Sequence, residues 1–133
     1  MDTADAALQH LIHDDTTMII EHRTYTLHPG KTQTYFSLYT SEGLSVQLEY
    51  LPHPIGYYTT ELGTLNQIIH MWAYETLDDR ARRRALLKRD ARWSAYVHKI
   101  LPLIQHQESK ILVPASFYTP TTATYSVSHE ECA

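Results

Sequence analysis

His70 is the residue of this sequence that is best placed for acid–base chemistry. It lies in the middle of Asn66–Glu75, a stretch with the length and composition of a buried strand, and shares one strand face with Trp72 and Tyr74. Imidazole exchanges protons near neutral pH, which suits proton transfer to a flat organic molecule. A structural role is an equally good interpretation: His70 would hydrogen-bond a carboxylate across the sheet, because buried polar groups are usually paired.

Two further residues could carry protons beside His70. His22 lies in a strand predicted to neighbour that of His70, so we expect both imidazoles near one cavity. Glu108, in the last predicted strand, is the next candidate. For Glu108 and for Glu21 we favour a different interpretation, a cross-strand or dimer-interface ion pair.

The aromatic composition indicates where a substrate would bind. The chain has 10 tyrosines and only 2 phenylalanines, and each buried phenol needs a hydrogen-bond partner. A polar aromatic cavity explains this bias, and so does a wet dimer interface. The predicted substrate contacts are Arg23, Tyr25, Tyr57, Trp72, Tyr74, Trp93 and Ser109.

A run of basic residues is the strongest charge feature. Eight of the 11 lysines and arginines lie between Arg80 and Lys99, although the net charge is −4. The run could contact anions or RNA, or it could be a solvated helix face paired with Asp78, Asp79 and Asp90. We favour the solvated face, because no aromatic base-stacking platform is interleaved with the run. We therefore predict neither nucleic acid nor membrane as a partner.

Several classes of site are not predicted. The sequence has no glycine-rich phosphate loop, no Cys/His zinc spacing and no serine in a nucleophile elbow, so we expect no metal and no cofactor. The single cysteine, Cys132, excludes an internal disulfide and fits a reducing compartment. No apolar run approaches the roughly 20 residues that span a bilayer. Because residues 1–17 also lack the features of a signal peptide, we expect a cytoplasmic protein.

The elements that must position these residues follow a recognisable order. We predict an α+β domain of ferredoxin-like βαββαβ order, a four-stranded antiparallel sheet with the helices on one face, over residues 18–118. Residues 1–17 are predicted to be an extension, either unstructured or a short helix, and residues 119–133 a polar tail. The predicted strands are Met18–Leu27, Ile55–Leu62, Asn66–Glu75 and His106–Val113, with helices from about Gly30, bent or ended near Gly43, and from Thr76 to Pro102, broken near Asp90.

The central strand predicts a partner. Ile69 and Met71 make its second face apolar too, although the helices can cover only one face. We therefore expect a homodimer formed through the other face of the sheet.

Four segments together resemble the NIPSNAP family. They are residues 18–30 (MIIEHRTYTLHPG), 55–75 (IGYYTTELGTLNQIIHMWAYE), 90–93 (DARW) and 107–114 (QESKILVP), within roughly Met18 to Phe117. The resemblance implies a dimeric α+β barrel, in which two ferredoxin-like protomers close their sheets together. Asp90-Ala91 departs from the Asp-Pro usual in the family, which changes a helix start. The wider superfamily includes cofactor-free monooxygenases, cyclases, dehydratases and haem enzymes, so the fold alone does not settle the function.

Three functional hypotheses follow. The first is a homodimer that binds a small organic molecule in a polar aromatic cavity, a cofactor-free enzyme with histidine acid–base chemistry of the isomerisation, cyclisation or oxygenation class. The second is an interaction protein that works through its dimer and the basic Arg80–Arg92 helix. The third places haem in the cavity with a histidine ligand.

Overall fold

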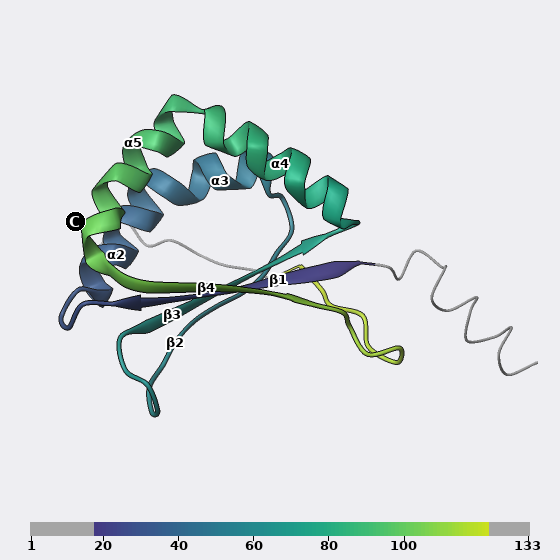
Figure 1. Ribbon diagram of the computed structural model, residues 1–133, viewed down its shortest axis with the longest axis horizontal. Helices are drawn as coiled ribbons and strands as arrows, with labels where there is room; N and C mark the ends of the chain where they lie inside the picture. The colour runs from purple at the N-terminus through teal and green to yellow at the C-terminus, as the bar shows by residue number, and fades with distance from the viewer. Residues whose placement is uncertain (1–17, 123–133) are drawn as a thin grey trace, which may run out of the picture.

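The computed structural model describes residues 18–122 of the chain (Figure 1). The predicted extension 1–17 and residues 123–133 of the predicted tail lie outside the described residues. The strands are β1 (Ile19–Leu27), β2 (Pro54–Thr59), β3 (Gln67–Tyr74) and β4 (Ile104–Leu112). The helices are α2 (Thr32–Leu38), the π-helix η1 (Tyr39–Gly43), α3 (Leu44–Tyr50), α4 (Leu77–Arg89), α5 (Ala91–Ile100) and the short 3₁₀ turn η2 (Leu101–Leu103).

The four strands form one antiparallel sheet in the order β2-β3-β1-β4. Helices α2 to α5 all cover the same face of this sheet (Figure 1). The predicted ferredoxin-like α+β fold is therefore confirmed. One connection differs from the prediction: β2 ends at Thr59, and residues 60–66 form a longer loop, with positive φ at Gly63 and Asn66.

Capping side chains explain where the last two helices begin. Thr76 caps α4, because its hydroxyl accepts the N–H of Asp79 at 3.0 Å. Asp90 ends α4 and caps α5, because its carboxylate accepts the N–H of Arg92 at 2.9 Å. The predicted break near Asp90 is thus confirmed.

Gly43 has a different role from the predicted bend. The helical path continues through it, but the turn is widened to a π-helix between Tyr39 and Gly43, an irregularity that often occurs at functional sites. A Cβ atom at Gly43 would lie 2.8 Å from the nearest atom of the Tyr96 ring. The absence of a side chain therefore lets α5 pack closely against η1.

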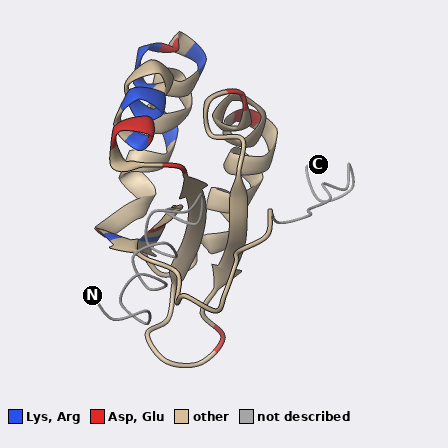
Figure 2. Ribbon diagram, turned by 90° about the vertical axis from the view of Figure 1, so that its right-hand side faces the viewer, with Lys and Arg blue, Asp and Glu red and all other residues tan. Residues whose placement is uncertain are grey.

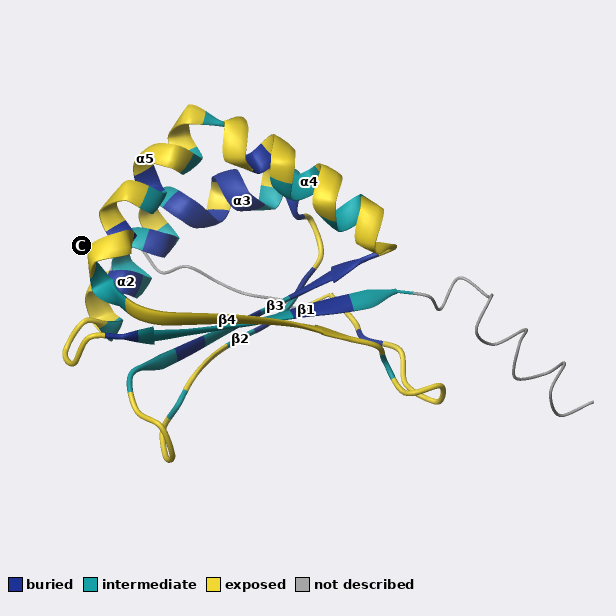
Figure 3. Ribbon diagram, viewed as in Figure 1, coloured by how far each residue is buried: buried dark blue, intermediate teal, exposed yellow. Residues whose placement is uncertain are grey.

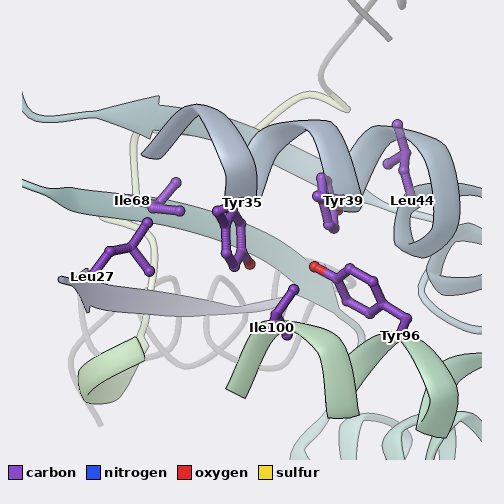
Figure 4. Close-up of a cluster of buried hydrophobic side chains, with 7 residues drawn as sticks. All are labelled: Leu27, Tyr35, Tyr39, Leu44, Ile68, Tyr96 and Ile100. Carbon is purple, nitrogen blue, oxygen red and sulfur yellow. The ribbon is translucent and has the colours of Figure 1, made fainter. Parts of the chain in front are cut away.

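The core lies between the sheet and the helices. One cluster joins α2, η1, α3 and α5 to the sheet through Leu27, Tyr35, Tyr39, Leu44, Ile68, Tyr96 and Ile100 (Figure 4). A second cluster contains Val46, Leu51, Trp72, Tyr74 and Leu87. On β3 the buried face is that of Ile68 and His70, whereas Ile69 and Met71 are half-buried on the face without helices. The edge strand β4 is exposed along most of its length (Figure 3). Coverage of the face without helices by a second copy stays a prediction.

Candidate ligand-binding cavity

A cavity of about 540 Å³ lies between the sheet and the helices. Its aromatic lining consists of Tyr25 from β1, Trp72 from β3, Tyr35 and Tyr39 from the first helical segment, and Trp93 and Tyr96 from α5. This volume falls within the range of small-molecule sites. Both tryptophans of the chain line it, which makes the indoles natural reporters of binding.

His70 lines this cavity and is almost wholly buried, with 4% of its surface exposed. Its Nε2 atom lies 3.3 Å from the Tyr35 hydroxyl. The rings of Tyr39, Tyr57 and Tyr25 have centroids 5.0, 5.5 and 5.8 Å from the imidazole. The partner of His70 is thus a phenol from α2 and not the carboxylate that the structural interpretation predicted.

The surroundings of His70 keep its imidazole neutral. Burial lowers the pKa of His70 to about 3, and the positive charge of Arg23 contributes in the same direction. Arg23 lies directly opposite His70 in the β1–β3 pairing. The free cavity therefore holds an uncharged imidazole at neutral pH, and that imidazole is a weak base.

The buried phenols form a short chain of hydrogen bonds beside His70. The Tyr39 hydroxyl donates to Oε1 of Gln47 at 2.6 Å and lies 3.4 Å from the Tyr57 hydroxyl. Burial raises the pKa of Tyr39 and of Tyr35 well above the usual value, so both remain protonated. The cavity wall consequently offers hydroxyl donors rather than phenolates.

Two polar groups of the wall make no hydrogen bond of normal geometry among the described residues. The indole Nε1–H of Trp72 is buried and has no acceptor. The Tyr96 hydroxyl points toward the rings of Tyr35 and Tyr39 (Figure 4), and the Tyr35 phenol is close enough to affect its pKa. Unpaired buried donors are costly, and a bound molecule could satisfy them.

Glu21 is a fully buried carboxylate that does not line the cavity but pairs with two residues that do, Arg23 and Arg84. Helix α4 provides two of its partners: Arg80 Nε donates at 2.7 Å and Arg84 Nη1 at 3.1 Å. Arg23 approaches the same carboxylate at 3.5 Å. Burial by itself would raise the pKa of Glu21, but the charges of Arg84 and the neighbouring guanidinium groups hold it below its usual value.

Tyr74 and Ser109 complete the surroundings of Glu21. The Tyr74 hydroxyl lies 3.2 Å from Oε1 and the Ser109 hydroxyl 3.0 Å from Oε2 of this carboxylate. Neither residue lines the cavity. Glu21 therefore forms ion pairs, but not the predicted cross-strand pair: its partners among the described residues are Arg23 on the same strand and Arg80 and Arg84 on α4.

The structure brings five of the predicted site residues to the cavity wall. These are Arg23, Tyr25, His70, Trp72 and Trp93. Tyr57 stands behind this wall and contacts the rings of His70 and Trp72, at centroid distances of 5.5 and 5.8 Å. Tyr57 and Tyr74 thus support lining residues instead of lining the cavity themselves.

His22 and Glu108 do not share the cavity with His70, so this prediction is wrong. His22 lies opposite Met71 on β3, and Glu108 lies opposite Thr24 on β1. Residues directly opposite each other in an antiparallel pair point to the same face, and successive residues alternate. His22 and Glu108 therefore lie on the sheet face that carries no helices.

Sequence reasoning overlooked lining residues from the helices. Tyr35 and Tyr39 are four residues apart on one helical segment, and Arg84 and Lys88 are four apart on α4. This spacing places each pair on one side of its helix, so the sequence could have predicted that the two side chains of a pair point in the same direction. Nothing in the sequence indicated which element each pair would face.

Most of the basic run is paired within the chain. The run lies on α4 and α5, where blue and red segments occur close together (Figure 2). Arg82 and Arg83 bind Asp79, and Arg92 binds Glu49 and Asp90, which confirms Asp79 and Asp90 as local partners. Arg80 and Arg84 instead turn toward Glu21, beneath the helix. The run is therefore only partly a solvated face.

Comparison with known proteins identifies the family of this chain. The model of the NIPSNAP family matches residues 20–119. The chain belongs to the NIPSNAP family. The NipSnap homolog of Dictyostelium discoideum is 33% identical over 94 residues, which cover 71% of this chain and 41% of that protein. NipSnap homolog 2 of Danio rerio is 31% identical over 100 residues, 75% of this chain and 34% of that protein. The chain thus spans less than half the length of these curated relatives.

Solved structures of NIPSNAP proteins share the fold. A family protein of unknown function from Agrobacterium tumefaciens matches with a TM-score of 0.78 and 40% identity, covering 82% of this chain and 98% of its own. A NIPSNAP-like domain protein from Burkholderia xenovorans matches with a TM-score of 0.77 and 41% identity, covering 84% and 97%. A Nitrosomonas europaea protein, described as a candidate antibiotic biosynthesis monooxygenase, has a TM-score of 0.56 and 11% identity, covering 74% and 90%. That last likeness shows the fold alone.

The surroundings of His70 do not fit a haem ligand, because its Nε2 atom is already 3.3 Å from the Tyr35 hydroxyl. The other histidine of the wall, His98 on α5, is exposed. Tyrosine rings also surround the imidazole of His70 at centroid distances of 5.0 to 5.9 Å. A porphyrin could reach it only by displacing these rings.

Proposed function

We propose that this NIPSNAP protein binds a small organic molecule in the aromatic cavity. The observation that carries the proposal is the combination of a 540 Å³ space with buried groups around it that lack hydrogen-bond partners, above all the Trp72 indole. Folded proteins rarely leave such donors unsatisfied. A ligand with an acceptor atom near Trp72 would remove that cost.

His70 and Tyr35 are the groups proposed to act on the bound molecule. Their polar atoms are 3.3 Å apart, so the Tyr35 hydroxyl can orient the imidazole, which would accept a proton from the bound molecule. Such a pair suits isomerisation, cyclisation or oxygenation of a flat substrate. Because the pKa of His70 is about 3 in the free protein, this role requires a ligand that makes the imidazole more basic.

The proposal includes a homodimer formed through the sheet face without helices. Ile69 and Met71 occupy the centre of that face and are only half-buried in one chain. Apolar side chains of a central strand gain stability when a second layer covers them. Light scattering at micromolar concentration is expected to give twice the mass of the chain, and a monomer would contradict the barrel.

The basic Arg80–Arg92 helix is a weaker candidate for the functional site than the cavity. Arg80, Arg83 and Arg84 are all engaged with groups of the same chain. A surface built to bind a partner protein through charge would keep these guanidinium groups available. In the part of the chain that the structure describes, no helix is long and apolar enough to cross a membrane.

A cavity-filling variant tests the small-molecule proposal. Val97 lines the cavity, so Val97→Phe should reduce the space and weaken binding of a flat aromatic probe such as naphthamide. Val113→Phe is the matched control, because Val113 follows β4 and is 76% exposed. The two indole N–H signals in NMR spectra report binding. Equal binding to both variants and the parent protein would overturn the proposal.

A further inference from the structure

We propose that the ligand of this cavity is an organic anion with a flat unsaturated body, its negative group held by Arg23, Arg84 and Lys88. This inference rests on the proposed function, because it specifies the class of molecule that the cavity binds. It comes from the charge balance of the wall, from the position of the unpaired indole and from the aromatic lining.

The charged part of the wall is entirely cationic. Arg23, Arg84 and Lys88 line the cavity, and none of the lining residues that the structure describes is an aspartate or a glutamate. Arg84 and Lys88 lie one helical turn apart on α4, so both can face the cavity. Arg23 joins them from β1, because it and Arg84 contact the same carboxylate, that of Glu21, at 3.5 and 3.1 Å. The three cations therefore gather at one end.

The local charges do not cancel. The guanidinium groups of Arg23, Arg80 and Arg84 share the single carboxylate of Glu21, and within residues 18–122 none of them pairs with another. Each of these three side chains is less than a third exposed, at 17%, 28% and 21%. Partly buried charges are stable when they are paired. An anion in the cavity would supply the missing negative charge.

Arg23 is already oriented for this purpose. Its Nε and Nη2 atoms donate to the Tyr25 hydroxyl at 3.1 and 3.0 Å. The guanidinium also lies 5.4 Å from the centroid of the same ring. A fixed donor loses little conformational entropy when a ligand binds, which favours affinity.

Trp72, whose indole N–H is unpaired, belongs to the same part of the sheet as the carboxylate that the arginines share. Trp72 is directly opposite Glu21 in the β1–β3 pairing, and only 1% of its surface is exposed. Its free N–H is a donor, as are the guanidinium groups, so the local groups lacking partners call for an acceptor. A carboxylate, enolate or phenolate oxygen would meet both the charge and the hydrogen bond.

The aromatic part of the cavity wall favours an organic anion over an inorganic ion. Trp93 and Tyr96 pack against each other, with ring centroids 5.0 Å apart, on the α5 side of the cavity. A phosphate or chloride ion would leave these rings without contacts. A flat unsaturated molecule would stack on them while its anionic group reaches the cations.

Such an anion would also alter the reactivity of His70. The positive charge of Arg23 is the second cause, after burial, of the low pKa of His70. A negative group beside Arg23 would offset that charge and raise the pKa of the imidazole. The bound anion would thereby make His70 a stronger base than it is in the free protein.

Three probes of one shape and different charge test the proposal. They are naphthoate, naphthamide and naphthylmethylammonium, titrated into the full chain while the two indole N–H signals are followed by NMR. Naphthoate is expected to bind about 10-fold more tightly than naphthamide, because charge-assisted hydrogen bonds are the stronger ones, and naphthylmethylammonium is expected to bind most weakly. Equal affinity for all three would overturn the charge inference and leave the proposed function intact.

Neighbouring residues of α4 provide matched variants. Lys88→Gln removes a cavity cation and should weaken naphthoate binding by about 3- to 10-fold, leaving naphthamide unchanged. Lys88 and Arg89 are both exposed, but only Lys88 lines the cavity, so Arg89→Gln removes the same charge and should change naphthoate binding less than about 2-fold. Equal effects of both variants would attribute the preference to overall charge and would overturn the assignment.

The remaining outcomes separate the two proposals. Competition of naphthoate by phosphate at similar concentration would mean that an inorganic anion suffices, which overturns the organic class. Absence of any indole shift with all three probes at about 1 mM, the weak limit of specific binding, would overturn both the charge inference and the proposed function.

Discussion

Acid sensitivity that depends on His70 is the sharpest consequence of its burial. The imidazole has a pKa of about 3 in the folded chain and 6.5 as an ordinary histidine. Below about pH 6.5 the unfolded chain binds a proton that the folded chain rejects, so stability is complete above this pH and falls as the pH decreases toward 3. At pH 5 the loss from this residue is about 2 kcal/mol, and it changes little for any folded pKa below about 4.

The measurement is a comparison of denaturant unfolding at about pH 7.5 and pH 5 for three proteins at one protein concentration. The parent protein should lose about 2 kcal/mol more between these pH values than His70→Gln, whose side chain does not titrate. His28→Gln is the control, because His28 is exposed in the turn after β1 and its loss should leave the parent behaviour. An identical pH dependence of the parent and His70→Gln would refute a buried neutral imidazole.

Three substitutions, with Arg82→Met as a control, test the packing and the ion pair beside the cavity. Gly43→Ala should cost about 1–3 kcal/mol in denaturant unfolding, because its Cβ would lie 2.8 Å from the Tyr96 ring; no loss would show that α5 packs less closely. Trp72→Ala should cost about 3–5 kcal/mol with an unchanged m-value, and a much smaller cost would mean that the ring is not packed. Arg80→Met should cost about 1–3 kcal/mol, because it removes a donor to the buried carboxylate of β1, whereas Arg82→Met, 64% exposed, should cost less than about 1 kcal/mol; equal costs would contradict the buried ion pair.

The fold was predictable because its signals are local. Thr76 and Asp90 mark helix ends through side-chain caps, which the sequence displays directly. The apolar residues on both faces of β3 identified it as a central strand. The loop of residues 60–66 was mispredicted because Leu62 was assigned to the second strand and Asn66, a residue type that tolerates positive φ, to the central strand.

The site was less predictable because it depends on which face each residue takes. His22 and His70 lie on neighbouring strands, but their opposite phases in the pleat separate them by the thickness of the sheet. A one-residue difference in register would have joined them in one cavity. Tyr35 and Tyr96 were visible as core residues, but their meeting beside His70 requires two helices distant in sequence to pack on the same strands.

The charged groups beside the cavity also attach helix α4 to the sheet. Leu87 is the only apolar residue of α4 that is buried, so this helix is held over the sheet largely by Arg80 and Arg84 binding Glu21. The attachment requires Glu21 to stay charged, and three guanidinium groups ensure this. Burial is the main reason that His70 stays neutral, and the positive charge of Arg23, which contacts the same carboxylate, adds to it. The contacts that fix α4 therefore also bring together the guanidinium groups to which the proposed anion would bind.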